Sequence, residues 1–480
     1  MRTKYKLLAI SLVIVLSGCQ KFLDKSYDNR ITPKLTEHFA QLMTDGYPVR
    51  HELFTDILSD DYQYYATLAQ ASINERFLPM YLYSDEYPLN LPSTGPENAY
   101  NEFYAKIYRA NLVIDGVLQS ERGSDSYKSA VMGEALLVRA YCHFLLVNLF
   151  GQHYDKATAS TDLGIGIVTK VSTENRQLVA RNTVQEVYDQ IEKDAIAGID
   201  YMKKGEADLS ANPYHFSLAS ANAFMTRVKL YKGEWDEVVK YADEVINIKG
   251  RTTRNLASDL ALITSRSREY YATMYMDPPT HPNILLSSYT TNLSVLTPTG
   301  YTLCGFFPTD ALRSSFTTTD RRRSLLIAVG TVIDNQVVAT KYNTQPNNPN
   351  SFVRTAHFTT DEVLLNRAEA VLRSANGTVE NALADVNVFR AARYTTYTPI
   401  VATGTTKEAL LAIVMDERRK EFLNEGLRWF DVKRLKIKVE HILGRGLQVA
   451  ASVGETDLKK ALQIPVVEQL GNPGIKLNPR

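Results

Sequence analysis

The segment from Glu417 to Arg434 interleaves carboxylates with arginines and carries the densest set of chemically capable side chains in the protein. On one helix, Glu425 and Arg428 would share a face. Glu417, Glu421 or Glu425 could act as a general acid or base. Carboxylates among this many arginines stay ionised and paired, however, so the pattern favours a structural ion network. We therefore expect structural roles for Glu417, Arg418, Glu425, Arg428 and Asp431.

A second pair of carboxylates, Asp60 and Asp61, could in principle belong to a glycosidase. Adjacent residues on one strand or turn point apart, so they cannot flank one glycosidic bond. A turn or a helix cap is the interpretation that we prefer for this pair. The 8 histidines show no HExxH or other metal-ligand spacing, and the chain has no GxSxG nucleophile motif. The sequence therefore argues against an enzyme and predicts no metal or cofactor.

The first nineteen residues have the pattern of an export signal. Arg2, Lys4 and Lys6 precede the apolar run from Leu7 to Leu16, and small residues then lead to Cys19. The run is too short to span a membrane, which needs roughly 20 apolar residues. Its Leu-Ser-Gly-Cys ending resembles a bacterial lipobox, which implies cleavage before Cys19 and lipid, including palmitate, on that cysteine. A plain secretory signal with an incidental cysteine is the alternative.

The remaining composition is that of a soluble globular protein, with 44% hydrophobic and 22% charged residues. Without the three basic residues of the signal, 51 basic and 53 acidic residues remain, a balance that argues against a general nucleic-acid binder. Cys142 and Cys304 have no CxxC partner, and we do not expect a disulfide between them. A single core rarely exceeds about 250 to 300 residues, so the chain needs two lobes or a solenoid.

Apolar residues at three- and four-residue steps predict helices from about Leu35 to Met43, Glu97 to Leu118, Lys128 to Phe150 and Asn182 to Met202. The third is apolar on nearly every side and should be buried. Two later helix pairs follow one plan: Ser217–Lys232 with Trp235–Ile248, and Asp361–Ala375 with Val379–Arg393. Each pair can bury its apolar face only against neighbours, which is typical of a tetratricopeptide-type stack.

Two stretches differ from the helices. Residues 48–96 read as long surface loops rich in tyrosine, and residues 250–358 read as an irregular lobe rich in serine and threonine. In the lobe, Asn283 to Tyr289 and Val332 to Ala339 are strand-like runs. Arg321 to Arg323 should form a solvated, salt-bridged surface, and the chain should end in a proline-set strap.

Five segments, in register over essentially the full length, resemble the SusD/RagB family of outer-membrane lipoproteins. They are Cys19 with Lys21 to Asp24; Gly133 to Gly151; the alanine-rich helix ending Leu230-Tyr231-Lys232-Gly233 before Trp235; Glu417 to Asp431; and Ile464-Pro465 with Asn472-Pro473. The sequence departs from the family pattern at the proline after Leu23-Asp24, which is displaced to Pro33, and at Ile167.

The resemblance implies a mainly α, SusD-like fold in which tetratricopeptide-like helix pairs carry an irregular loop-rich lobe with short strands. The expected divisions are a signal peptide at 1–18, a helical region with ligand loops at 19–250, a loop-rich insert at 251–358 and a C-terminal helical region with a strap at 359–480. It also implies a non-enzymatic, lipid-anchored lid on a TonB-dependent barrel at the outer-membrane cell surface, where it captures oligosaccharides or, in some branches, peptides.

Sugar binding needs flat aromatic faces and a few hydrogen-bonding groups in a preformed concave site. The two loop-rich stretches supply both, although exposed tyrosines in loops often simply pack the loop. The candidate ligand residues are Asp61, Tyr64, Tyr65, Arg76, Tyr81, Tyr83, Tyr87, Asn90, Tyr289, Tyr301, Phe306 and Tyr342. A peptide-binding lid, a surface hydrolase and a scaffold that binds only its barrel partner remain as alternatives.

Overall fold

The computed structural model describes residues 33–49, 51–65, 77–84, 96–172, 178–205, 212–265, 281, 283–290, 305–325, 327–333, 336–339, 353–444, 446 and 448–480. Its helices are α3 (Thr36–Thr44), α4 (Glu52–Ile57), α6 (Pro96–Gly116), α7 (Asp125–Phe150), α8 (Val184–Gly205), α9 (Leu218–Lys232), α10 (Trp235–Lys249), α11 (Leu256–Ser265), α14 (Asp310–Ser315), α15 (Arg322–Leu325), α16 (Thr360–Arg373), α17 (Val379–Ala391), α18 (Lys407–Glu421), α19 (Leu427–Arg434) and α20 (Val466–Gly471), with short 3-10 turns η1 (Val117–Gln119) and η4 (Leu458–Lys460).

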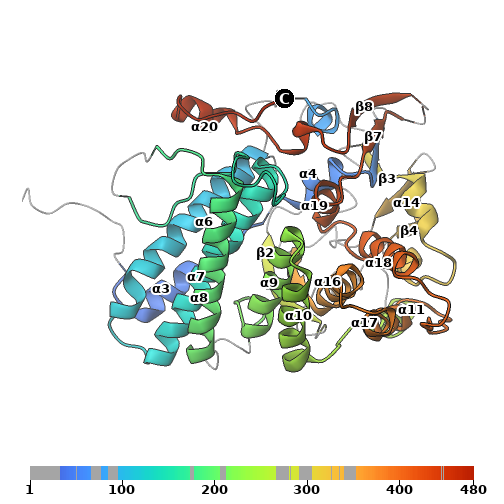
Figure 1. The fold of residues 1–480 in the computed structure, drawn as a ribbon, viewed down its shortest axis with the longest axis horizontal. Helices are drawn as coiled ribbons and strands as arrows, with labels where there is room; N and C mark the ends of the chain where they lie inside the picture. The colour runs from blue at the N-terminus through green and yellow to red at the C-terminus, as the bar shows by residue number, and fades with distance from the viewer. Residues whose placement is uncertain are drawn as a thin grey trace, which may run out of the picture.

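The described strands form two-stranded antiparallel ribbons. They are β1 (Tyr62–Tyr64) with β3 (Phe306–Pro308), β2 (Ile284–Thr290) with β6 (Val353–Thr359), β4 (Ile327–Ile333) with β5 (Gln336–Ala339), and β7 (Val439–Ile442) with β8 (Val449–Val453). In Figure 1 the long helices α6, α7 and α8 stand together, α9, α10 and α16 follow beside them, and β7, β8 and α20 run across one end. The mainly α fold class is confirmed.

Helix α7 is the core of the N-terminal half. Every residue from Ala130 to Phe150 is buried, because α6 and α8 pack along it and α9 covers a further part. Among the described helices, α7 alone is long and apolar enough to cross a membrane, but 94% of that stretch is buried inside the protein. The prediction of a fully buried helix is therefore confirmed, and α7 behaves as a core helix.

The two predicted helix pairs are confirmed as α9 with α10 and α16 with α17. α9 packs on α10 and α10 packs on α16, so each pair covers its apolar face with the next. Ser217 begins α9 with a reciprocal capping box, and Gly233 ends it in the left-handed conformation, with φ of 71°. The local start and stop signals and the contact pattern agree on a tetratricopeptide-like stack.

Three expectations about local structure are wrong. The described parts of residues 48–96 are not surface loops, since α4 and β1 are buried and residues 77–81 form a further helical turn. The run from Val332 to Ala339 is not one strand, because β4 ends at Ile333, β5 begins at Gln336 and the two pair with each other antiparallel. The segment from Glu417 to Arg434 is not one helix, since α18 ends at Glu421 and Gly426 has φ of 70° before α19 begins.

A buried ion network joins the insert to the C-terminal helices. Arg322 has no exposed side-chain surface and pairs with Asp320 at 2.8 Å, with Glu421 at 3.1 Å and with Glu417. Arg393, which follows the end of α17, forms a second ion pair with Glu421, at 2.9 Å. The expectation of a solvated arginine surface is thus wrong at Arg322, because carboxylates of α18 and the ring of Tyr394 enclose its guanidinium group. Burial alone would raise the pKa of Glu417, but the neighbouring cations lower it to about 2.

We predict that Gly133→Ala destabilises the protein by about 1–3 kcal/mol, measured by urea unfolding. A Cβ at Gly133 would lie 2.8 Å from the carbonyl oxygen of Gly198 in α8, and this clash outweighs the roughly 1 kcal/mol of helix preference that alanine adds. Gly454→Ala is the matched control, since no atom lies within 4 Å of a Cβ there. Equal stability of the two variants would contradict close α7–α8 packing.

We predict that Glu417→Gln lowers the free energy of unfolding by roughly 3–5 kcal/mol, because it leaves buried cations without their counter-charge. The pKa of Glu417 is lowered from 4.5 to about 2 in the folded state, so its contribution is complete above pH 4.5 and disappears as the pH falls toward 2. The variant should therefore lose part of the wild-type pH dependence in this range. Glu237→Gln, at an exposed pair with Lys240, should change stability by less than about 1 kcal/mol, and a similar loss in both variants would refute the network.

Candidate functional site

Several candidate ligand residues meet in one aromatic cluster, which comprises Tyr64, Tyr81, Tyr83, Phe306 and His441. The Tyr64 and Phe306 ring centroids lie 5.1 Å apart, and Tyr81 lies 5.4 Å from Phe306. His441 of β7 is stacked between the Tyr81 ring, at 3.9 Å, and the Tyr83 ring, at 4.8 Å. The structure thus brings together residues from β1, β3, β7 and the turn at 77–83, four of which are candidate ligand residues.

The aromatic cluster faces inward. Tyr64, Tyr81 and Phe306 are each 1% exposed and Tyr83 is 6% exposed. The Tyr81 hydroxyl donates to the backbone oxygen of Ile442 at 2.9 Å and the Tyr83 hydroxyl to that of Leu58 at 2.8 Å, while burial raises the pKa of both phenols. Their placement matches the packing interpretation that the sequence left open, and these rings support the surrounding segments.

Tyr65 forms a smaller contact beside this cluster. It is 9% exposed, and its ring meets Phe307 edge-on at 5.6 Å between centroids. Its backbone N–H donates to the Gly305 oxygen at 2.7 Å, which extends the β1–β3 ribbon by one residue. Tyr65 therefore marks the point where the N-terminal candidates and the insert lie side by side.

Asp60 and Asp61 are held by arginines from the C-terminal region. Asp60 accepts two hydrogen bonds from Arg428, at 2.7 and 2.8 Å, and Asp61 accepts one from Arg419 at 2.6 Å. Arg419 also lies 3.3 Å from Asp60, so the expectation that the two carboxylates point apart is wrong. Burial would raise the pKa of Asp60, but Arg428 and Arg419 lower it below its usual value. For Asp61, burial outweighs the charge of Arg419 and raises the pKa above its usual value. Both carboxylates fasten β1 to α18 and α19 through their arginines.

The structural roles expected for the C-terminal carboxylates and arginines agree with the contacts. Glu417 lies in the buried network, Arg418 pairs with Asp431 at 3.3 Å, and Arg428 pairs with Asp60. Glu425 lies in the turn between α18 and α19, so it does not share a helix with Arg428. No cluster of histidine, cysteine, aspartate and glutamate suited to a metal occurs among the described residues.

The other candidates lie wholly or partly outside the described residues. Cys19, Arg76, Tyr87, Asn90, Tyr301 and Tyr342 lie outside the described residues, and of Tyr289 only the backbone, in β2, is described. Some described residues near these segments pair with other parts of the chain. Tyr65 bonds to Gly305, Thr290 pairs with Val353, and β3 contacts β5. Of these contacts, only that of Tyr65 with Gly305 joins the N-terminal region to the insert, because β2–β6 and β3 with β5 lie in the insert and at its C-terminal edge.

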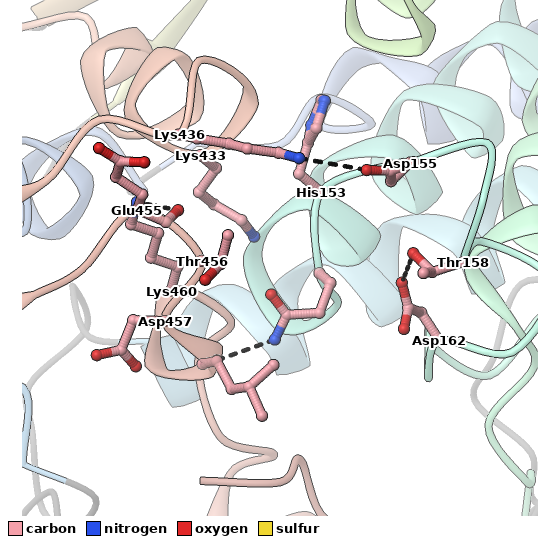
Figure 2. A pocket seen from close by; sticks show the side chains of 12 residues that line it. His153, Asp155, Thr158, Asp162, Lys433, Lys436, Glu455, Thr456, Asp457 and Lys460 are labelled. Carbon is pink, nitrogen blue, oxygen red and sulfur yellow. Dashed lines mark hydrogen bonds and ion pairs between the residues drawn. The ribbon is translucent and has the colours of Figure 1, made fainter.

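A cavity lies elsewhere, where the chain after α7 faces the root of the β7–β8 ribbon. Figure 2 shows its lining: one wall comes from residues 152–162 and the other from residues 433–436 and 455–460. It has a volume of about 280 Å³. Lys436 lies 3.4 Å from Asp155, and the Thr158 hydroxyl donates to Asp162 at 2.6 Å. Sequence reasoning missed this cavity because its two walls are some 280 residues apart and carry no motif.

Comparison with known families supports the resemblance. Residues 21–230 match a family model described as "Starch-binding associating with outer membrane", and residues 328–464 match one described as "SusD family". No curated protein matches the chain in sequence. The first match lies in the N-terminal half of the chain and the second in the C-terminal half, and the two do not overlap.

Solved structures show the same fold over nearly the whole chain. A sugar-binding protein from Bacteroides vulgatus, assigned that role provisionally, is 21% identical with a TM-score of 0.74 over 94% of this chain and 99% of its own. A SusD superfamily protein from Bacteroides thetaiotaomicron is 21% identical with a TM-score of 0.72, covering 93% and 98% of the two chains. A laminarin-binding SusD-like protein is 18% identical with a TM-score of 0.66, covering 93% and 99%. The protein described here belongs to the SusD/RagB family.

Proposed function

We propose that this protein captures oligosaccharides at the cell surface and delivers them to a TonB-dependent transporter in the outer membrane. The observation that carries the proposal is the SusD-like fold, which extends over more than nine-tenths of the chain and which this protein shares with glycan-binding relatives. A protein of this kind binds its cargo and performs no chemistry on it. Asp60 and Asp61 are bound by arginines that fasten β1 to the C-terminal helices, a structural use that is compatible with that role.

The proposed location is the outer face of the outer membrane, with lipid on Cys19 as the anchor. The basic start, the apolar run and the small residues before Cys19 support it. A lipid anchor places the protein at the membrane surface, and the buried state of α7 leaves the described helices without a membrane-facing span. The barrel partner follows from this setting, because captured oligosaccharides need a transporter to cross the membrane.

We place the ligand beside the β1–β3 ribbon, which joins the N-terminal region to the insert. Tyr64, Tyr81, Tyr83 and Phe306 form the floor beneath this region and do not present their faces to solvent. The groups proposed to touch the sugar are six further candidates: Arg76, Tyr87, Asn90, Tyr289, Tyr301 and Tyr342. They combine aromatic faces with a guanidinium and an amide, which suits stacking on sugar rings and hydrogen bonding to hydroxyls.

Calorimetric titration with a panel of neutral oligosaccharides tests this function on the chain that starts after Cys19. We predict that replacing Tyr87, Tyr301 and Tyr342 together by alanine weakens binding tenfold or more, because each stacking contact is worth roughly 0.5–1.5 kcal/mol. Tyr108→Ala is the matched control, since that tyrosine is 43% exposed on α6, away from the ribbons. A peptide mixture is titrated in the same way. Binding of peptides but of no oligosaccharide would move the protein to a peptide-importing role. Binding of neither would favour a scaffold that binds only its barrel.

A further inference from the structure

The cavity in Figure 2 contains two buried lysines that have no carboxylate partner. Lys433 is 4% exposed and Lys460 is 3% exposed. The Lys433 ammonium donates to the backbone oxygens of Asn148 and, at 2.8 Å, of Gly151. The Lys460 ammonium donates to those of Ile437, at 2.7 Å, and Glu455, at 2.9 Å. An ammonium has three donors, so each of these groups keeps one N–H beyond its two backbone bonds.

This arrangement is an exception within the described part of the chain. All its other buried lysines and arginines form an ion pair with a carboxylate: Lys106, Arg139, Arg227, Lys229, Arg254, Arg322, Arg393, Arg418 and Lys420. Removing a charge from water without a counter-charge is costly. The cavity therefore holds positive charge that the protein itself does not neutralise.

Burial lowers the pKa of Lys460 and the charges of Asp457 and Glu455 oppose this effect, but no carboxylate of the cavity pairs with Lys433. Asp155 is paired with Lys436 at 3.4 Å. Figure 2 shows the side chains of Glu455 and Asp457 pointing away from the Lys433 ammonium, toward the outer rim. Burial, followed by the charge of Lys433, lowers the pKa of His153 to about 3, so this imidazole is neutral. An anion that enters the cavity thus meets Lys433 without a competing carboxylate beside it.

The facing wall offers hydrogen-bonding groups of another kind. Asp162 and Thr158, bonded to each other at 2.6 Å, lie across the cavity from Lys433 (Figure 2). Thr456 also lines the cavity. Acceptors on one wall and an ammonium on the other suit a molecule with hydroxyl groups at one end and an anionic group at the other. The volume of about 280 Å³ is at the small end of the roughly 300–1,000 Å³ of ligand pockets, which leaves room for one ring.

We propose that this cavity binds an anionic sugar, a single ring that carries a carboxylate, sulfate or phosphate, with its anionic group at Lys433 and its hydroxyls at Asp162 and Thr158. The site is separate from the proposed oligosaccharide site beside the β1–β3 ribbon. It would allow the protein to recognise a charged unit of a glycan in addition to a neutral stretch.

A proton accompanies the ligand at this site. Burial, and after it the charge of Lys460, lowers the pKa of Lys433 to about 7, so the amine is partly neutral at pH 7.5. Lys460, Lys436, His153, Asp155, Asp162, Glu455 and Asp457 are the titratable groups of the cavity, and none of the carboxylates pairs with Lys433. A bound anion favours the ammonium, so binding takes up a proton. The affinity should be highest below pH 7 and fall about tenfold for each pH unit well above it.

The test is calorimetric titration of the chain without its first nineteen residues, none of which belongs to the described fold. The probes are glucuronate, glucose 6-sulfate, glucose 6-phosphate and glucose, each at pH 7.5 in two buffers of different ionisation enthalpy. We expect at least one anionic sugar to bind tenfold or more tightly than glucose, with a buffer-dependent heat that reports proton uptake. The anionic probes tell which group the cavity prefers.

Two variants and a control locate the binding. Lys433→Met should abolish binding of the anionic sugar, and Thr456→Val, at an exposed position that forms no hydrogen bond within the described chain, should weaken it about three- to tenfold without a change in unfolding temperature. Lys438→Met removes an equal charge at a lysine whose side chain is 58% exposed, and should leave binding unchanged. Equal affinity for glucose and the anionic sugars, absence of proton uptake, or equal effects of Lys438→Met and Thr456→Val would overturn the proposal. Neutral oligosaccharides should bind the Thr456→Val variant as they bind wild type, so this result is independent of the proposed function.

Discussion

The carbonyl groups at the C-terminal end of α7 impose a constraint on which the rest of the structure depends. The last carbonyls of a helix have no partner within it, and here they are buried. Lys433 donates to Asn148, the Leu462 N–H donates to Leu149 at 2.8 Å, and Asn478 donates to Phe150 at 2.8 Å. Partners for one helix end therefore come from residues some 280 to 330 positions later. The C-terminal region has to return to the N-terminal half for the core to form, which explains why β7, β8 and the strap run across that end.

Buried charge plays two different roles in this fold. Around Arg322 and Glu417, cations and carboxylates from the insert and from α16 to α18 neutralise one another, so the charges specify how the segments meet. Asp60 and Asp61 likewise attach β1 to α18 and α19. At Lys433 and Lys460 the partners are only backbone oxygens, so the charge remains available to a ligand. The same residue types thus support structure in one place and recognition in another, and the difference depends on the presence of a carboxylate.

The sequence predicts what local pattern decides. The periodicity of α7 and the caps at Ser217 and Gly233 were sufficient to predict buried and paired helices. Prediction from local sequence failed where a segment distant in the chain supplies the packing or ionic partner. Tyr81 and Tyr83 look like exposed loop residues, but His441 inserts its ring between them. Arg322 looks solvated, but α18 covers it. Gly426 breaks what reads as one helix because its positive φ turns the chain into α19. The cavity at Lys433 is invisible to any local pattern, since its walls meet only after folding.

The central claim is that this member of the SusD/RagB family binds a glycan beside the β1–β3 ribbon, which joins its N-terminal region to its insert. The most direct measurement is a crystal structure of the protein with a neutral oligosaccharide bound. The account predicts sugar density near the ends of β1–β3, over the floor formed by Tyr64, Tyr81 and Phe306. Sugar bound only on another face of the molecule, with this region empty at saturating ligand, would contradict it.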